Sequence, residues 1–428
     1  MMNSELITFL NQSPTPFHAT ENLAALVQAS GFKKLSEKEN WNLVPGEAYY
    51  VTRSGSSFLA FVYGSQSHSE TGIRILGAHT DSPCLKLKPQ PEKYQCGYQQ
   101  FTIEVYGGAL LNPWFDRDLS IAGKLVWRDK KGKLKSSLVD FRRPMASIPS
   151  LAIHLDRDAN IGRTVNPELH MNPLWCQAES QQDFRAYLKK YLLGEGQEVE
   201  KVLDFNLSFY DCQGASLIGE NEEFIAGARL DNLLSCFVCA RALVDSPRKQ
   251  TTILVCNDHE EVGSNTDIGA QGSLLSDVLA RIEPDALKLQ RTLRSSVMAS
   301  VDNAHGVHPN YQNKHEKKSG PLLNRGPVIK YDAKQGYATS SDTAAMLSHL
   351  ASLPGQDEIP MQSFTMRADM RCGSTIGPIT AAKTGVQTVD LGVSTFAMHS
   401  IRELAGAQDT HYLYNLLCRF IDSSLPNS

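Results

Sequence analysis

Two short acidic clusters constrain this chain most, because each follows an apolar run that has the character of a buried strand. The first is His79-Thr80-Asp81, after residues 72–78, and the second is Asp258-His259-Glu260-Glu261, after residues 251–256. Loops at strand ends are where α/β proteins build their sites. An unpaired carboxylate beside a buried strand costs more free energy than a fold can usually spare, so these charges need partners. Metal cations are the obvious partners.

Length and composition place the chain among soluble globular proteins. It has 428 residues, of which 41% are hydrophobic, so it can bury a large core and is expected to form two or so domains. No run approaches roughly 18 apolar residues, so we expect no membrane span. The N-terminus lacks the pattern of a signal peptide. The nine cysteines form an odd, scattered set that fits reduced thiols, so we expect a cytoplasmic protein.

Charge and local motifs exclude some functions. The net charge of −4 argues against a nucleic-acid surface, which needs an excess of basic residues. The basic run at 128–135 contains Gly132 between strand-like runs, so we interpret it as a solvated hairpin turn. Cys236 and Cys239 form a C-x-x-C pair inside an apolar, helical stretch. Two small residues on a packed helix face explain this pair better than a redox or zinc motif.

The pattern of apolar residues changes along the chain. Residues 4–30 predict two short helices broken at 13–16, and residues 49–63 predict a hairpin around a Ser/Gly turn. From about 93 to 217 the sequence is rich in β-type runs, Gly, Pro and Arg. We therefore predict a separate, mainly β domain, 93–217, inserted into a domain that comprises 1–92 and 218–428.

In the second half, apolar strands alternate with helical patterns. The predicted strands cover 251–257, 295–301, 327–331, 361–367 and 386–393. This alternation predicts an α/β fold in which a mostly parallel sheet is flanked by helices on both faces.

Potential metal ligands recur at strand ends and helix starts. Two imidazoles and three carboxylates form the set: His79, Asp231, Glu261, Asp302 and His399. Such a mixture of nitrogen and oxygen donors suits zinc, with cobalt or manganese as substitutes. Five side chains can serve two ions if one carboxylate bridges them, and ion pairs about 3.5–4 Å apart are a known hydrolytic design.

The residues beside these ligands predict supporting roles. Glu260 can stay unligated next to Glu261 and act as a general base. Asp81 lies on the same side of an extended chain as His79 and can accept its second ring N–H. We interpret His259 as a structural neighbour and not as a ligand. The residues alone thus favour a two-metal hydrolase and leave its substrate open.

Several longer strings are shared with one known family. They are SPTPFHA (13–19), GAHTDSP (77–83), NPWFDRDL (112–119), LAIHL (151–155), DHEEVGS (258–264), DNAHGVHPNY (302–311), CGSTIGP (372–378) and AMHSIRE (397–403). Over essentially its full length, the sequence resembles the aspartyl aminopeptidase family of dizinc exopeptidases. The motif Arg367–Gly373 carries Met370-Arg371 where animal members of that family have Thr-Pro.

The resemblance implies a metal assignment and a mechanism. His79 and Asp302 would hold one zinc, Glu261 and His399 the other, and Asp231 would bridge them. Glu260 would take a proton from the attacking water and return it to the leaving amine.

The resemblance also implies a substrate and an assembly. Family members prefer an N-terminal Asp or Glu, and Lys330, His305 and Tyr337 stand where the groups that recognise it are expected. The inserted domain would build a dimer within a twelve-subunit homo-oligomer. His154 would reach into the active site of a neighbouring subunit.

Two alternatives remain. The same dizinc site could serve a carboxypeptidase or an N-acyl amino-acid deacylase, and a requirement for a free α-amine would separate these from an aminopeptidase. The chain could also be a non-enzymatic scaffold shell, against which the intact Glu260 and the complete ligand set argue.

Overall fold

A computed structural model describes residues 2–180 and 182–423, which form two compact units. The α/β unit contains the described residues up to Ser82, from Ala215 to Met398 and from Glu403 onward. The inserted unit contains Pro83 to Gly214 and the segment His399 to Arg402. Strand β5 (Cys84–Gln95), which belongs to the inserted unit, runs across the boundary that the sequence analysis placed at 93.

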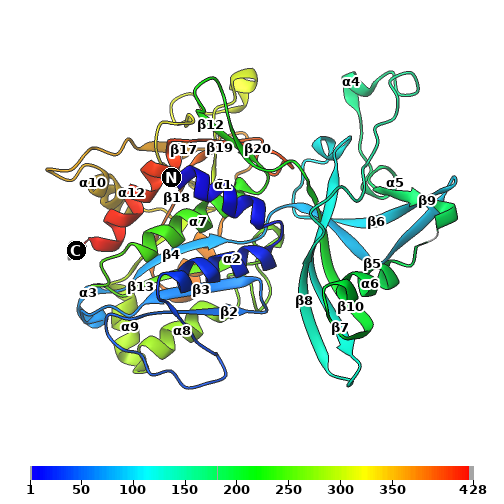
Figure 1. Cartoon of the computed structure of the whole chain (residues 1–428). Coiled ribbons are helices and arrows are strands. Elements are labelled where there is room, and N and C mark those ends of the chain that lie inside the picture. The colour runs from blue at the N-terminus through cyan, green and yellow to red at the C-terminus, as the bar shows by residue number, and fades with distance from the viewer. Residues whose placement is uncertain (1, 181, 424–428) are drawn as a thin grey trace. The chain divides into compact units, whose positions relative to one another are not determined.

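The helices of the α/β unit are visible in Figure 1 around its largest sheet. They are α1 (Met2–Gln12), α2 (Pro16–Ala29), α3 (His68–Thr71), α7 (Leu230–Val244), α8 (Leu274–Ile282), α9 (Ala286–Arg294), α10 (Ser341–Ala351), α11 (Ile376–Thr384) and α12 (Asp409–Asp422), with 3₁₀ turns η3 (Glu260–Val262) and η4 (Pro309–Lys314). The predicted break between the first two helices is confirmed, and Pro16 occupies the first turn of α2, where its missing N–H costs nothing.

Among the described residues, nine strands form the main sheet of this unit in the order β1-β2-β3-β13-β4-β14-β18-β16-β17. Their bounds are β1 (Lys33–Lys34), β2 (Ala48–Arg53), β3 (Ser57–Val62), β4 (Arg74–His79), β13 (Thr252–Asn257), β14 (Val297–Val301), β16 (Val328–Tyr331), β17 (Gln362–Thr365) and β18 (Gln387–Gly392). The centre, from β13 to β18, is parallel, while β3 and β16 join it antiparallel. The sheet is therefore mixed around a parallel core.

Alternation along β4 explains why helices cover both faces of the sheet. Successive side chains of a strand point to opposite faces. Leu76 belongs to the core cluster that includes Phe237 of α7 and Leu416 of α12, whereas Ile75 belongs to the cluster that includes Val278 of α8. All of these side chains are buried. The predicted α/β class with helices on both faces is confirmed.

A second, smaller sheet in the same unit has the order β11-β12-β20-β19-β15. Its strands are β11 (Ser216–Ile218), β12 (Phe224–Gly227), β15 (Ala304–His305), β19 (Ser394–Phe396) and β20 (Glu403–Gly406). It continues from β14 and β18, because β15 and β19 follow them along the chain.

The inserted unit is built on an antiparallel sheet with the order β8-β7-β10-β5-β6-β9. Its elements are β5, β6 (Tyr98–Tyr106), η1 (Asn112–Trp114), β7 (Leu119–Asp129), β8 (Leu134–Asp140), α4 (Ala159–Gly162), α5 (Pro167–His170), β9 (Leu174–Gln177), η2 (Ala178–Ser180), α6 (Phe184–Gly194) and β10 (Val199–Asp211). Aromatic rings dominate its core, where Phe101 stacks on Trp175 at 4.6 Å and meets Phe184 edge-on at 5.0 Å.

Two local predictions are confirmed. The basic run forms the turn between β7 and β8, where Asp129 accepts hydrogen bonds from the backbone N–H groups of Lys131 and Lys133. Cys236 and Cys239 lie fully buried in α7. Within residues 2–180 and 182–423, no helix is long and apolar enough to cross a membrane.

Candidate metal centre

The central strands of the main sheet bring the acidic clusters together. Strands β13, β4 and β14 are parallel neighbours, so their carboxyl ends lie at one edge of the sheet. His79 is the last residue of β4, and it pairs in register with Asn257, the last residue of β13. Asp302 directly follows β14. Glu260 and Glu261 follow β13 in the turn η3, so the loops after all three strands meet at this edge.

The distances define a compact cluster around His79. Its Nε2 lies 3.4 Å from Asp231 Oδ1 and 3.7 Å from Asp302 Oδ1. Potential ligand atoms of His79, Asp231 and Asp302 all lie within 4.8 Å of one another, and so do those of His79, Glu260 and Glu261. The α/β unit thus brings together the four predicted ligands that it contains and the predicted base.

Asp81 is fully buried and hydrogen-bonds the acidic turn that carries Glu260 and Glu261. Its two carboxylate oxygens accept hydrogen bonds of 3.1 Å from the backbone N–H groups of Glu260 and Glu261. The predicted contact with His79 takes a different form, because Nδ1 lies 3.0 Å from the Asp81 carbonyl oxygen and 3.5 Å from the carboxylate. An acceptor at Nδ1 leaves Nε2 to face the cluster.

Burial and mutual repulsion govern the charges. Burial raises the pKa of Glu260 to about 7, an effect that His79 opposes and that Asp302 and Asp81 reinforce. Burial also raises the pKa of Glu261 to about 10, with Asp231 adding to the shift. The pKa of His79 is lowered by burial, but hydrogen bonds to Asp231, Asp302 and Asp81 raise it well above its ordinary value. The cluster therefore favours added positive charge, and its imidazole and carboxylate donors fit zinc.

The segment before α7 positions Asp231. Its backbone N–H donates to Glu403 Oε2 at 2.9 Å, and its carbonyl accepts a 2.6 Å hydrogen bond from Ser82. The peptide bond between Asp231 and Asn232 is cis. Sequence reasoning missed Glu403, which lies in the matched string 397–403 but shows no chemical signal of its own.

A glycine keeps room beside Asp302. A Cβ on Gly392 of β18 would lie 1.9 Å from the Asp302 carbonyl oxygen. The Asp302 N–H donates to the Leu391 carbonyl at 2.8 Å, which extends the β14–β18 pairing to this ligand. Glycine at 392 thus lets the chain pass Asp302 closely.

Lys330 of β16 hydrogen-bonds the carboxylate of Asp302. Its Nζ donates to Asp302 Oδ2 at 3.2 Å and to the Asn303 carbonyl at 2.9 Å, and only 1% of the residue is exposed. The Tyr337 ring centroid lies 5.0 Å from this Nζ. His305 packs edge-on against Phe364 at 5.7 Å. These three predicted pocket residues therefore lie in the α/β unit on the side of Asp302.

The two remaining predicted residues lie in the inserted unit. His399 Nδ1 is 3.2 Å from the Gly108 carbonyl oxygen, a contact of the kind that fixes the tautomer of a metal-binding imidazole. His154 is exposed in the loop between β8 and α4. We do not expect His259 to be a ligand. Its Nδ1 lies 2.9 Å from the Thr266 hydroxyl oxygen.

Comparisons with known proteins agree with this site. The family model "Aminopeptidase I zinc metalloprotease (M18)" matches residues 9–421. The probable M18 family aminopeptidase 2 of Stutzerimonas stutzeri (strain A1501) is 53% identical over 426 residues, which cover 99% of this chain and 98% of the relative. The corresponding protein of Pseudomonas putida (strain GB-1) is 53% identical over 425 residues, with the same coverage.

Solved structures show the same fold. A chain in the cryo-EM structure of the Ape4 and Nbr1 complex has a TM-score of 0.93 and 37% identity, covering 98% of this chain and 85% of that one. A chain of the S. cerevesiae mApe1 dodecamer has a TM-score of 0.85 and 29% identity, covering 98% and 96%.

The fold and the cluster at the edge of its sheet define a zinc-exopeptidase-like peptide hydrolase. The chain belongs to the M18 family, the aspartyl aminopeptidases, and is a zinc metallo-aminopeptidase. The resemblance that the motifs indicated is confirmed.

Proposed function

We propose that this enzyme removes N-terminal Asp or Glu from peptides, with Glu260 as general base and two zinc ions per subunit. One observation carries the proposal: Glu260 and Glu261 come together with His79, and Asp81 holds both of their backbone N–H groups. This arrangement allows Glu261 to be a ligand while its neighbour Glu260 remains available for proton transfer.

In the proposed assignment, His79 and Asp302 would hold one ion, Glu261 and His399 would hold the other, and Asp231 would be shared between them. Cobalt or manganese could substitute. Zinc, when bound, supplies Lewis-acid polarisation of the scissile carbonyl and lowers the pKa of the attacking water.

The protein's own groups handle the proton. A Glu260 carboxylate oxygen accepts the proton of the attacking water and later delivers it to the leaving amine. Asp81 contributes by fixing the backbone that carries Glu260.

Lys330, His305 and Tyr337 are proposed to form the pocket for the acidic first residue. The positive charge of Lys330 supports this proposal, although its hydrogen bonds are directed to Asp302 and Asn303.

We also propose a homo-oligomer built from dimers through the inserted unit and reaching a dodecamer, the state of the related mApe1. Exposed apolar side chains gather in the loop region of this unit, where Leu151, Ile153, Leu155 and Ile161 are all at least 48% exposed. Such clustering is typical of surfaces that another chain covers. His154 lies among them, which supports a role in the active site of a neighbouring subunit. Reduced cysteines support a cytoplasmic location.

The test is release of the first residue from short peptides that differ only in that residue and in its acetylation. We expect cleavage of free Asp and Glu peptides, no cleavage of acetylated ones, and a loss of about 10²–10⁴-fold in Glu260→Ala with zinc retained. Processing of acetylated or C-terminal substrates would instead indicate the deacylase or carboxypeptidase alternative. No cleavage by zinc-loaded protein would favour the scaffold alternative.

A further inference from the structure

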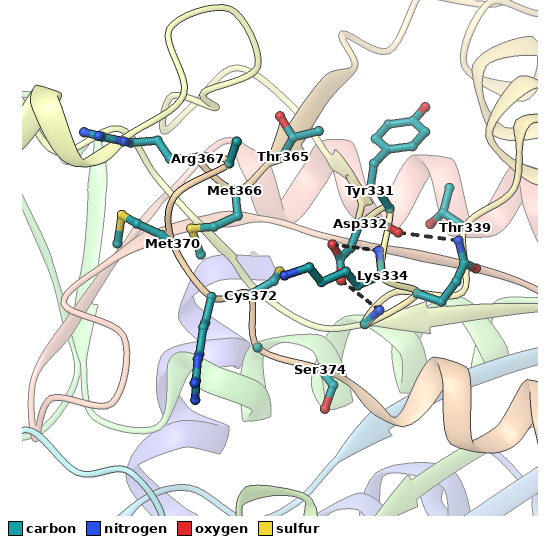
Figure 2. Close-up of a pocket in the computed structure, with 16 residues that line it drawn as sticks. Tyr331, Asp332, Lys334, Thr339, Thr365, Met366, Arg367, Met370, Cys372 and Ser374 are labelled. Carbon is teal, nitrogen blue, oxygen red and sulfur yellow. Dashed lines mark hydrogen bonds between the residues drawn. The ribbon is translucent and has the colours of Figure 1, made fainter.

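A cavity of about 1100 Å³ lies between two loops of the α/β unit (Figure 2). One loop, 331–339, follows β16, and the other, 365–374, follows β17. These strands are parallel neighbours, so both loops leave the sheet at the same edge. Because β16 pairs antiparallel with β18, these loops do not leave the sheet at the carboxyl ends of β4, β13 and β14, and the cavity is connected to the candidate metal site through side-chain contacts instead.

Two cations at this cavity have no ionic partner among residues 2–180 and 182–423. The side chains of Lys334 and Arg371 are exposed, and within the described residues neither makes an ion pair or a side-chain hydrogen bond. Figure 2 shows Lys334 extending from its turn into the space between the loops.

The other charged groups of the lining are already engaged. The Asp332 carboxylate accepts hydrogen bonds from the backbone N–H groups of Lys334 and Gly336, at 3.2 and 2.9 Å. Arg367 binds Asp369 through two hydrogen bonds of 3.0 and 2.7 Å. The charge left over in the cavity is therefore positive, and the ligand it favours is an anion.

The cavity wall connects to the support of Asp302. Cys372, which lines the cavity, packs against the small apolar cluster that includes Tyr337. The Tyr337 ring lies 5.0 Å from Lys330 Nζ, which donates to Asp302 Oδ2. Tyr337 and Phe364 share a small apolar cluster with Met366 and Cys372. A ligand in this cavity would consequently be connected to the candidate metal ligand Asp302 through three side chains, those of Cys372, Tyr337 and Lys330.

Lys330 alone is poorly placed to recognise an acidic substrate group. It is 1% exposed and directs hydrogen bonds to Asp302 and Asn303, which it would have to give up. Arg371 and Lys334 would lose only water on meeting a carboxylate. A guanidinium can also bind a carboxylate through two parallel hydrogen bonds, which adds geometric selectivity.

We propose that Arg371 and Lys334 form a carboxylate-binding subsite in this cavity that receives an acidic side chain of the peptide substrate. The inference rests on the proposed function, because it assumes that peptides with acidic residues are cleaved. It adds two residues, on the loops after β16 and β17, to the pocket proposed above as determinants of acid selectivity.

The experiment uses zinc-loaded full-length enzyme and three pairs of tetrapeptide amides, with Glu or Gln at position one, two or three. The ratio of kcat/KM for Glu over Gln is measured at each position. The variants are Arg371→Gln and Lys334→Gln. Arg291→Gln and Lys38→Gln, exposed cations of the same unit outside the cavity, are matched controls.

We expect Arg371→Gln to lower the Glu/Gln ratio at one position by about tenfold, as loss of one charge-assisted hydrogen bond predicts. Lys334→Gln is expected to lower the same ratio, while the controls leave it unchanged and hydrolysis of the Gln peptides stays within about twofold. Arg371→Glu should reverse the preference and favour Lys over Glu at that position. This gain of activity also shows that the variant is folded.

Unchanged ratios in both cavity variants, with a wild type that prefers Glu, would overturn the subsite and leave the proposed function intact. A wild type that cleaves no peptide would overturn the proposed function itself. Free glutarate provides the remaining arm of the test. If it alters cleavage of neutral peptides only when Arg371 is present, and the substrate ratios do not change, the cavity binds a separate acidic molecule and the substrate assignment is wrong.

Discussion

Two groups of buried carboxylates in the α/β unit are satisfied in different ways. Asp409, at the start of α12, accepts hydrogen bonds from the backbone N–H groups of Asn324 and Gly326 at 2.7 and 2.8 Å. At the metal centre, carboxylates of Asp231 and Asp302 instead turn toward one imidazole, with ligand atoms within 4.8 Å. The fold thus satisfies the Asp409 oxygens with hydrogen bonds from its own N–H groups, whereas the second arrangement is suited to an ion.

Removal of metal should have the largest effect on activity and on the unfolding free energy. It should also distinguish the clustered carboxylates, which need the ion, from Asp409, which does not. Chelation is expected to abolish activity and to destabilise the protein, because it returns the clustered carboxylates to mutual repulsion. Zinc at about 100 times its Kd should restore about 2.7 kcal/mol of unfolding free energy. Activity assays and thermal unfolding with and without a chelator measure both effects, with cobalt and manganese as further additions.

Asp409→Asn is the control for this comparison, because within the described part of the chain Asp409 belongs to no candidate ligand set. We expect the variant to show the same stabilisation by zinc as the wild type. An equal stability of chelated and zinc-loaded wild type would contradict the assignment of the cluster as a metal site.

Asp81→Asn should have the next largest effect. An amide presents only one acceptor oxygen, so one of the two N–H groups of Glu260 and Glu261 would lose its partner. Loss of such a supporting group typically costs about 10–100-fold in metal affinity or activity. Zinc titration and kcat measured at saturating zinc separate the two contributions. Wild-type values for both would show that Asp81 does not position the acidic turn.

The substitution Asp409→Asn should have the smallest effect. This effect is on the unfolding free energy, and it depends on pH. Burial raises its pKa to about 6, so between about pH 4 and 6 the folded protein holds a proton that the unfolded chain has released. The contribution of Asp409 to the unfolding free energy therefore falls as pH rises through this window, by about 2–3 kcal/mol at most. Asp409→Asn lacks this titration.

Denaturant unfolding of both proteins at several pH values measures the difference. Other buried acids are common to both and cancel. We expect the wild type to lose stability relative to Asp409→Asn as pH rises from about 4 to 6, while kcat of the two stays within about twofold. Parallel stability curves would show that Asp409 is not a buried, titrating group.

Much of the fold could be predicted because it follows from local patterns of apolar residues in the sequence. The apolar runs at 251–257 and 295–301 are β13 and β14, and the broken helical pattern near Pro16 is the pair α1 and α2. The antiparallel entry of β16 was not predictable, because strand direction depends on pairing with β18, far along the chain. Long-range pairing also decides that β5 joins the inserted unit.

For the site, the sequence indicated the ligand types but not their support. His79 and Asp302 follow apolar strands, and that signal is local. The roles of Glu403, which holds the Asp231 N–H, and of the Asp81 carbonyl arise only when distant segments meet. The cavity between the loops after β16 and β17 likewise depends on two strands whose paired residues are 34 positions apart in the sequence, such as Lys330 with Phe364.

The central claim, a paired zinc site bridged by Asp231, is tested most directly by counting metal. Native mass spectrometry of the zinc-reconstituted protein gives the number of ions per chain for the wild type and for Asp231→Asn. We expect two zinc ions per wild-type chain and fewer in the variant, with Asp409→Asn matching the wild type. One zinc per wild-type chain, or two retained in Asp231→Asn, would contradict the account.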